Sequence, residues 1–535
     1  MKRVSVLDCT LRDGGYCNNW KFGKNNIKRV IDGLFAANIE YIECGYLIDR
    51  IEYDENRTKF SDIRQIDGII PEHKVGKVCC VMVNYGEYSI EKLPKCSETC
   101  IDGIRVAFRK NDFKDAIRFC AEIKKKGYLV FVQPMVSMSY SGAEFIELIQ
   151  EVNRLKPYAF YIVDSFGMMK RKALMQLVEL TDINLQDDII LGFHAHNNLQ
   201  LAYSNAQYLT EHILKRSLII DVSVHGMGRG AGNLNAELFL DYLNETLDAQ
   251  YSIRPILNLM DEIISRFYEE KSWGYSLPNY LSAIHLLHPN YATYLNDKKT
   301  LTLEAMDEIF GMIEPDKGIE YDTKYIESLY IEYLSRRDRE DFSIIEIEKK
   351  ICGRKVLLIA PGKSVVDQKD KIIEFVEKEQ PVIFSINHDY PYYESDYIFV
   401  SNMRRFRELN EKVYDKTIIT SNIKSKKTYA CVEYHRLLNS VEGVRDNAGL
   451  MAIKFLAEMG VSEFFIAGFD GYSYDVYNNF ETRDMALLNS AEFLVRLNDG
   501  IRQVIKMYAK TYEIHFVTDS MIVPENNTKD AKKTK

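Results

Sequence analysis

Residues 189–196 read IILGFHAH, a short apolar run that ends in two histidines separated by one residue. A run of β-branched and apolar residues of this length is typical of a buried strand. Alternate residues of an extended segment share a face, so His194 and His196 can reach the same metal ion. An HxH pair also occurs where histidines only pack or form hydrogen bonds, so the pair alone leaves both interpretations open.

Seven further runs of this kind occupy the first 225 residues and alternate with helical patterns. They cover residues 4–7, 41–44, 75–82, 103–106, 129–133, 159–163 and 219–224. Eight strands with about thirty residues between their starts predict an α/β fold of the (β/α)8 TIM-barrel type. A doubly wound open sheet also alternates strand and helix, so the count alone does not exclude it.

Reactive side chains lie at or just after the ends of these runs. They are Arg12, Asp13, Glu43, Arg105, Gln133, Ser165, His194, His196 and His225. In a closed parallel barrel all strand ends meet on one face, so these groups would converge on one pocket, whereas an open sheet would spread them along an edge. Their positions therefore favour the barrel.

Asp13 extends the histidine pair into a set of metal ligands. It follows Arg12 in TLRDGG, and a carboxylate with two imidazoles suits a divalent ion that keeps open coordination positions. Gly14 and Gly15 let the chain turn sharply and bring its backbone close to a ligand. Taken alone, TLRDGG also fits an ordinary Asp-Gly turn with an outward-facing arginine.

Four segments in this order resemble the DRE-TIM metallolyase superfamily. They are LDCTLRDGGY (7–16), IECGY (42–46), FHAHNNLQLAYSNA (193–206) and GMGRGAGNLNAE (226–237). The resemblance covers about residues 1–300, and VDSFG (163–167) together with GMGRGAGN is most similar to the 4-hydroxy-2-oxovalerate aldolase branch. It implies a lyase that makes or breaks a carbon–carbon bond next to a 2-oxo acid through a metal-bound pyruvate enolate, with an aldehyde as the other partner.

The resemblance also assigns roles to residues. Asp13, His194 and His196 fall on the family's metal ligands, and Asn233 falls where some members add an oxygen ligand. The metal is expected to be Mn2+, with Mg2+, Co2+ or Zn2+ as alternatives. Arg12 is expected to donate to the enolate oxygen, and Glu43 to orient Arg12 or a metal-bound water. Ser165 falls where the aldolases hold the carboxylate end of pyruvate. Beyond what the resemblance assigns, Arg105, Gln133 and His285 are further candidates for substrate binding.

The chain departs from the aldolase pattern at Tyr16, where that branch has a histidine that acts as the base. Tyrosine is a poor base at neutral pH but a competent hydrogen-bond donor. Either Tyr16 is activated by the metal and Arg12, or His225 or His285 supplies the base, or the substrate differs and needs none. An acetyl-CoA-dependent Claisen synthase and a bifunctional polysaccharide or sugar-acid biosynthesis protein are the alternative functions.

The chain is expected to contain a barrel at 1–262, a helical extension and linker at 263–345, a smaller Rossmann-like α/β domain at 346–523 and a disordered tail at 524–535. The second domain faintly resembles Rossmann-type sialyltransferase and glycosyltransferase folds. If that holds, a nucleotide sugar or sugar phosphate would contact Gly362, Ser364, Asn387, Asn402 and Asp470. Otherwise the domain only docks or oligomerises the barrel.

Composition sets the broad class. A net charge of −9 over 535 residues argues against a general nucleic-acid binder. The ten cysteines are scattered, which favours reduced thiols in the cytoplasm. We find neither a secretory signal nor a membrane span, and we expect a homo-oligomer.

Overall fold

The computed structural model describes residues 4–71, 74, 76–212, 216–298, 301–335, 343–425, 427–475, 479–480, 485 and 490–523. The chain forms two compact units. Unit 1 comprises Met1–Thr293 and Glu314–Tyr321, and unit 2 comprises Tyr294–Ile313 and Asp322–Lys535. The predicted disordered tail at 524–535 lies outside the described residues.

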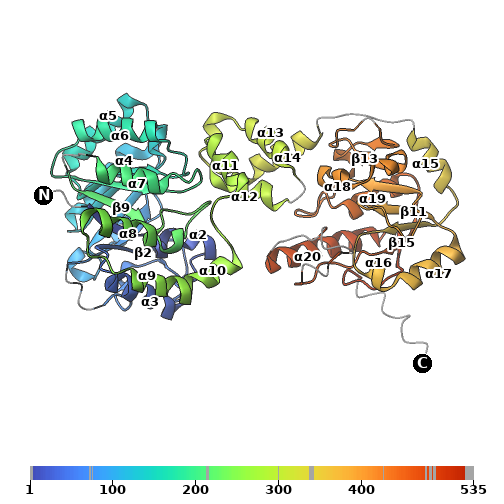
Figure 1. The fold of residues 1–535 in the computed structure, drawn as a ribbon, viewed down its shortest axis with the longest axis horizontal. Helices are drawn as coiled ribbons and strands as arrows, with labels where there is room; N and C mark the ends of the chain where they lie inside the picture. Colours follow the sequence, from blue (N-terminus) through green and yellow to red (C-terminus); the bar gives the residue numbers. More distant parts are fainter. Residues whose placement is uncertain are drawn as a thin grey trace. The chain divides into compact units, whose positions relative to one another are not determined.

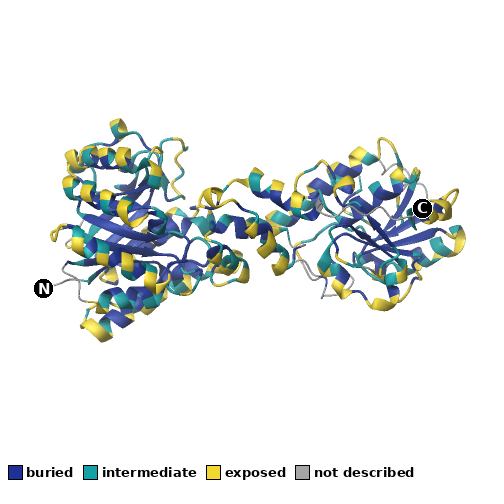
Figure 2. Cartoon of the chain, turned by 90° about the horizontal axis from the view of Figure 1, so that it is seen from above, coloured by how far each residue is buried: buried dark blue, intermediate teal, exposed yellow. Residues whose placement is uncertain are grey.

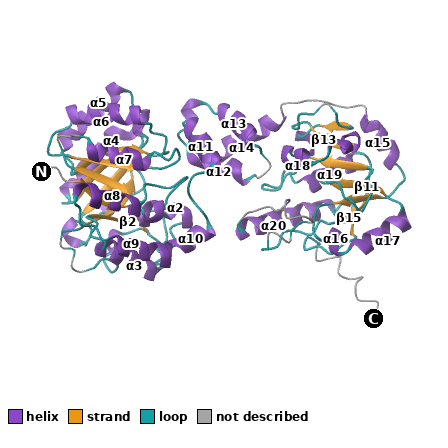
Figure 3. Ribbon diagram, in the orientation of Figure 1, coloured by secondary structure: helices purple, strands orange, loops and turns teal. Residues whose placement is uncertain are grey.

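Unit 1 is built on a closed barrel of eight parallel strands (Figures 1 and 3). In order around the barrel these are β1 (Val4–Asp8), β2 (Tyr41–Leu47), β4 (Val78–Asn84), β5 (Gly103–Phe108), β6 (Leu129–Pro134), β7 (Ala159–Asp164), β8 (Ile190–Ala195) and β9 (Leu218–Val222). β1 pairs with both β9 and β2, which closes the barrel. The predicted TIM barrel and its eight strands are confirmed, and the open sheet is excluded.

Helices cover the outside of the barrel. They are α3 (Lys24–Ala36), α4 (Phe113–Lys125), α5 (Gly142–Leu155), α6 (Arg171–Asn184), α7 (Ala202–Glu211) and α8 (Ala236–Leu247). α4 shows why: its apolar residues Ala116, Cys120 and Ile123 lie on one face and are buried. In the described parts of the β2–β4 and β4–β5 connections, 3-10 turns and the two-residue strand β3 (Lys59–Phe60) replace the helix.

Two apolar layers hold the barrel together. Along β1, Val6 packs against the outer helices, whereas its neighbour Leu7 packs inside the barrel with Phe131 and Tyr161. This alternation follows from the two-residue period of a strand. The strands are accordingly the most buried part of unit 1 (Figure 2).

After the barrel, unit 1 continues as helices. These are α9 (Ile253–Leu259), a π-helical turn (Met260–Ile264), α10 (Ser265–Glu270), α11 (Leu277–Ile284) and the start of α12 (Pro289–Asp297). The helical reading of this stretch agrees with the lack of strand patterns in its sequence. α13 (Leu303–Gly311) and α14 (Thr323–Ser335) belong to unit 2.

Unit 2 contains a separate parallel sheet of seven strands in the order β14-β13-β12-β11-β10-β15-β16. The strands are β10 (Val356–Ile359), β11 (Val382–Ile386), β12 (Tyr397–Val400), β13 (Thr417–Thr420), β14 (Ala430–Val432), β15 (Glu463–Ala467) and β16 (Glu513–Phe516). Besides α13 and α14, its helices are α15 (Ser343–Ile351), α16 (Ser364–Asp367), α17 (Lys369–Glu379), α18 (Met403–Glu408), α19 (Ala448–Glu458) and α20 (Ala491–Tyr508). The strand order reverses between β10 and β15, as in doubly wound folds, so the predicted α/β character is confirmed.

None of the helices in the described ranges has the length and apolar character needed to cross a bilayer. All ten cysteines are free thiols.

Candidate metal centre and active site

Asp13, His194 and His196 meet at the carboxyl end of the barrel. Asp13 ends the short helix α1 (Thr10–Asp13) after β1, and the two histidines lie at the end of β8. One ligand atom of each residue lies within 4.8 Å of the others, and all three side chains are buried. His196 Nε2 is 3.6 Å from Asp13 Oδ2. The sequence prediction that these groups converge is therefore what the structure shows.

The ionisation of the cluster suits a cation. Burial by itself would raise the pKa of Asp13, but Arg12 and the two imidazoles hold it well below its ordinary range. Burial lowers the pKa of His196 to about 3. At neutral pH the cluster thus presents a carboxylate and a neutral imidazole, which are the protonation states that bind a metal.

Hydrogen bonds fix the orientation of both imidazoles. His194 Nδ1 lies 2.9 Å from Asp221 Oδ2, and His196 Nδ1 lies 3.3 Å from the carbonyl oxygen of Arg229. A histidine that uses Nδ1 in this way has Nε2 left for a metal. Asp221 was not among the predicted site residues, although it is the only acidic residue of the run at 219–224.

Asn233, predicted as a further oxygen ligand, contacts the cluster through its amide nitrogen. Its Nδ2 donates to Asp13 Oδ2 at 2.7 Å, and its amide oxygen is enclosed without a hydrogen-bond partner. A Cβ at Gly228 would come within 2.8 Å of Asp13 Oδ2, so this position needs glycine for the loop to approach the cluster. A carboxylate, two imidazoles and an unpaired amide oxygen form a donor set that fits a divalent cation.

A series of buried ion pairs connects Asp13 to His194 through residues outside the cluster. Arg12 pairs with Asp13 through Nη1, and its Nε donates to Glu43 Oε2 at 2.8 Å. Arg105 Nη1 lies 2.9 Å from the same Glu43 oxygen, and Arg105 Nη2 pairs with Asp221, the partner of His194. Asp13 and His194 thus lie at opposite ends of one continuous series of ion pairs.

Gln133 completes the surroundings of Arg105. With its amide oxygen turned toward the guanidinium, Gln133 accepts hydrogen bonds from Arg105 Nε at 2.8 Å and Nη2 at 2.6 Å. Arg105 is fully buried and Gln133 is 2 % exposed. This placement favours a positioning function for both residues over the substrate contact predicted for them.

Two further carboxyls, at the ends of strands β1 and β7, have pKa values near neutral pH. Burial raises the pKa of Asp8 to about 7, against hydrogen bonds from Thr10 that lower it. Burial likewise raises the pKa of Asp164 to about 6, against the amide groups of Met168 and Met169, which donate to it. Neither residue was predicted, although each directly follows one of the predicted runs, the position at which the other reactive side chains were found.

Tyr16 lies beside Arg229, which the sequence motifs contained but which was not singled out. The Arg229 guanidinium carbon is 3.9 Å from the centre of the Tyr16 ring, and its Nη1 is 3.3 Å from His288 Nε2. Tyr16 also contacts Trp20 edge-on. Tyr16, which stands where the aldolase branch has a histidine, therefore stacks against the guanidinium of Arg229.

The other two candidate bases have different surroundings. His225 has a left-handed backbone (φ 55°), its Nδ1 is 4.0 Å from Glu237 Oε1, and its ring packs against Tyr268 and Trp273. His285 is the C-terminal cap of α11, and its N–H donates to Leu281. The structure brings His288 rather than His285 to Arg229. A catalytic part for His225 and a substrate contact for His285 stay predictions.

Ser165 follows β7, and its Oγ accepts a hydrogen bond from the N–H of Val136 at 2.9 Å. The hydroxyl keeps its own proton to donate, which is compatible with the predicted contact to a substrate carboxylate.

In unit 2, three of the five predicted contact residues come together where the strand order reverses. Asp470 Oδ2 accepts from the N–H of Ser364 at 2.8 Å, and a Cβ at Gly362 would lie 2.6 Å from the Asp470 carboxyl. The Asp470 carboxylate thus already accepts a hydrogen bond from the backbone amide of Ser364, which a phosphate would otherwise use. Asn402 caps α18 by accepting from Arg405, and the amide oxygen of Asn387 is enclosed without a partner.

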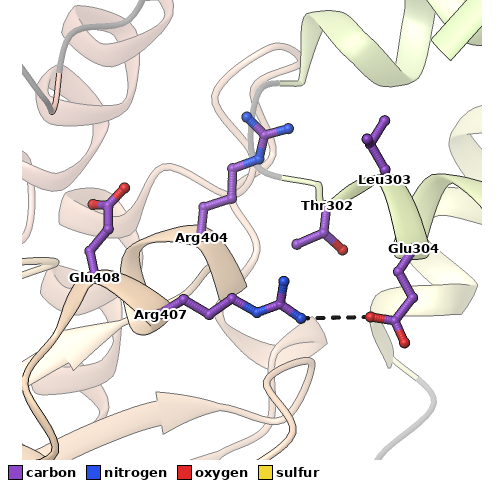
Figure 4. Close-up of a pocket in the computed structure, with 6 residues that line it drawn as sticks. All are labelled: Thr302, Leu303, Glu304, Arg404, Arg407 and Glu408. Atoms are coloured by element: carbon purple, nitrogen blue, oxygen red, sulfur yellow. Dashed lines mark ion pairs between the residues drawn. The ribbon is translucent and has the colours of Figure 1, made fainter. Parts of the chain in front are cut away.

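A second feature of unit 2 is a surface hollow between α13 and α18 (Figure 4). Arg407 pairs with Glu304 across it at 3.6 Å, and Arg404 Nε donates to the carbonyl of Leu301 at 2.7 Å. Its charges are therefore used in packing α18 against α13, and none of the predicted contact residues lines it.

Comparison with known proteins assigns unit 1. The HMGL-like family model matches residues 3–261. An oxaloacetate decarboxylase of Mycobacterium tuberculosis is 25% identical over 236 residues, which is 43% of this chain and 67% of the relative. A 4-hydroxy-2-oxovalerate aldolase of Geobacillus thermodenitrificans is 24% identical over 267 residues, 49% of this chain and 76% of the relative.

Among solved structures, the N-terminal domain of a putative aldolase from Bacteroides vulgatus is 26% identical, with a TM-score of 0.46 over 56% of this chain and 98% of that one. The family match falls on the part of the chain that holds Asp13, His194 and His196, and the relatives are named as lyases. Residues 3–261 therefore belong to the HMGL-like family, as the sequence motifs predicted, and form an enzyme domain of the lyase class.

Proposed function

We propose that unit 1 is a divalent-metal-dependent lyase that makes or breaks a carbon–carbon bond next to a 2-oxo acid, through the enolate of pyruvate or a close analogue. The observation that carries this proposal is the buried Asp13, His194 and His196 cluster with Arg12 paired directly to one of its members. The aldolase and decarboxylase names of the relatives support it.

Asp13, His194, His196 and Asn233 would hold the cation, which we propose to be Mn2+, since carboxylate and amide oxygens suit this ion. When bound, it would polarise the 2-oxo group as a Lewis acid. Mg2+, Co2+ and Zn2+ are the alternatives.

Arg12 is the residue that stabilises the developing enolate charge. Its Nε and Nη1 are held by Glu43 and Asp13, which leaves Nη2 for a substrate oxygen. A guanidinium does not lose its proton at any relevant pH, so it acts as a fixed hydrogen-bond donor, as in an oxyanion hole. Glu43 orients it and does not itself need to contact substrate.

Loss of CO2 from a 2-oxo dicarboxylate is a second candidate. It proceeds through the same enolate but needs no base for a hydroxyl proton. The observation that favours it is Tyr16, whose ring lies under Arg229 at the position where the aldolase pattern has its basic histidine. The lyase names of the relatives favour both candidates over a Claisen synthase, and a nucleotide-sugar ligand for unit 2 stays a prediction.

Exchange of the pyruvate methyl protons in D2O tests the proposal, because exchange requires the enolate and no second substrate. The full chain is incubated with pyruvate and Mg2+, or with Mn2+ that is removed before the NMR measurement. We expect exchange that stops on chelation and in His196→Ala, and that persists in His212→Ala, an exposed histidine paired with Tyr208. Exchange that is independent of metal, or equal in His196→Ala, would refute the proposal.

A further inference from the structure

Arg229 is a half-buried arginine with no carboxylate at ion-pair distance among the described residues, and the charge of Asp13 acts on it only from farther away. Its Nε is enclosed without a partner. The other two arginines of the site, Arg12 and Arg105, each pair with two carboxylates. Burying a charge without a partner is costly, so an unpaired guanidinium beside the metal ligands indicates a missing anion.

His288 points to the same missing anion. Its Nδ1 accepts a hydrogen bond from the N–H of Asn290 at 3.1 Å. A neutral imidazole carries one proton, which must then lie on Nε2, the atom 3.3 Å from Arg229 Nη1. Two donors therefore lie next to each other, and an anionic oxygen placed beside both could accept a hydrogen bond from each. Burial, reinforced by the charge of Arg229, lowers the pKa of His288 to about 3, so the neutral form is the relevant one.

Tyr16 holds the arginine in this place. The guanidinium stacks on its ring at 3.9 Å, while the carbonyl of Arg229 accepts from the metal ligand His196. A cation–π contact of this kind fixes the plane of a guanidinium without using its hydrogen-bond donors. Tyr16 is thus a positioning residue, and the N–H groups of Arg229 stay available for a ligand.

We propose that Arg229 and His288 bind a second anionic group, a carboxylate or a phosphate, on the part of the substrate beyond its 2-oxo acid end. The inference rests on the proposed function and narrows it to dianionic 2-oxo acids, with Tyr16 positioning the arginine. The neutral aldehyde product implied by the aldolase resemblance is then replaced by an acidic one or by CO2.

Binding of three probes to the full chain in the presence of Mg2+ tests the proposal. They are 2-oxoglutarate, 3-phosphonopyruvate and 2-oxovalerate, of which the last lacks a second anionic group. By calorimetry we expect at least one of the two dianions to bind tenfold or more tightly than 2-oxovalerate, as charge-assisted hydrogen bonds imply. Whichever dianion is preferred identifies the group as carboxylate or phosphate.

Variants show whether Arg229 is responsible. Arg229→Ala should remove the preference and leave 2-oxovalerate binding within about threefold, Tyr16→Phe should keep it, and Tyr16→Ala should lose most of it. Arg171→Ala is the matched control, because Arg171 is an exposed arginine stacked on Tyr208 at 4.3 Å. Equal weakening of all three probes in Arg229→Ala would overturn the proposal, since Arg229 would then bind the common 2-oxo carboxylate. So would the absence of any preference in the unaltered protein.

Pyruvate proton exchange separates this inference from the proposed function. Exchange in the unaltered protein together with a dianion preference lost in Arg229→Ala supports both. A preference that depends on Arg229 without exchange supports the anion site and refutes the lyase. Exchange without any preference supports the lyase and refutes the anion site.

Discussion

Arg105 Nη1 lies 2.9 Å from Glu43 Oε2, and both side chains are fully buried. Arg105 also pairs with Asp221, and Glu43 also pairs with Arg12. The orientation of the metal ligand His194 and of the proposed enolate donor Arg12 thus depends on one interior arginine. Charges this deep are stabilised only when every partner is present.

Replacing Arg105 with alanine should therefore destabilise unit 1 by about 3–5 kcal/mol, because Glu43 and Asp221 would lose their shared cation. Both tryptophans of the chain, Trp20 and Trp273, lie in unit 1, so tryptophan fluorescence during denaturant unfolding reports on this unit alone.

The control is Arg171→Ala, which removes an exposed arginine and should change the free energy of unfolding by about 0.5 kcal/mol or less. If the two variants unfold at the same denaturant concentration, the ion-pair chain does not support the barrel.

Asp221→Asn should weaken metal binding by about 10- to 100-fold, since the hydrogen bond that orients His194 Nδ1 loses its charge. Calorimetric titration with Mn2+ measures the change. Asp188→Asn, which alters an exposed residue before β8 at the opposite end of the barrel, should bind as the unaltered protein does. An unchanged affinity in Asp221→Asn would show that Asp221 does not orient the ligand.

The barrel and its metal ligands could be predicted from sequence because both depend on local patterns. Eight apolar runs locate the strands, and His194 and His196 follow one of them directly. Arg229 and His288 could not be paired in this way, because they lie 59 positions apart and come together only in the fold.

Arg105 illustrates the opposite difficulty. Its place in a strand run predicts that it is near the site, but not whether it points to substrate or into the barrel interior. In unit 2 the APGKS turn was expected to offer its amides to an anion, and only the structure shows that Asp470 accepts from Ser364. Asp470 lies 106 residues further along the chain, so no local pattern reveals this contact.

The raised pKa of Asp8 predicts a pH-dependent stability. Burial raises this pKa from 3.8 to about 7, so the folded state holds a proton that the unfolded chain releases. The stabilisation is complete below about pH 4, falls as the pH rises toward 7 by up to about 1.4 kcal/mol per pH unit, and is absent above.

An Asp8→Asn variant has no carboxyl at this position, so it neither holds nor releases this proton. We expect the free energy of unfolding of the unaltered protein, minus that of the variant, to fall by a few kcal/mol between pH 4 and pH 8. Tryptophan fluorescence with EDTA present measures it without a contribution from metal. A difference that stays constant with pH would mean that Asp8 is ionised in the folded state.

Arg12→Ala tests whether the enzyme stabilises an enolate or only binds its substrate. Because Arg12 would contact the enolate oxygen through Nη2, its loss should slow pyruvate exchange by about 100-fold or more and change the affinity for pyruvate far less. Arg12→Lys keeps the charge but cannot pair with Glu43 and Asp13 through a planar fork, so it should restore little of the rate. Guanidinium ion added at a non-denaturing concentration should restore part of the rate in Arg12→Ala but not in Arg12→Lys, where the ammonium group occupies the space. A variant with weaker pyruvate binding and an unchanged rate at saturation would instead make Arg12 a ground-state binding residue.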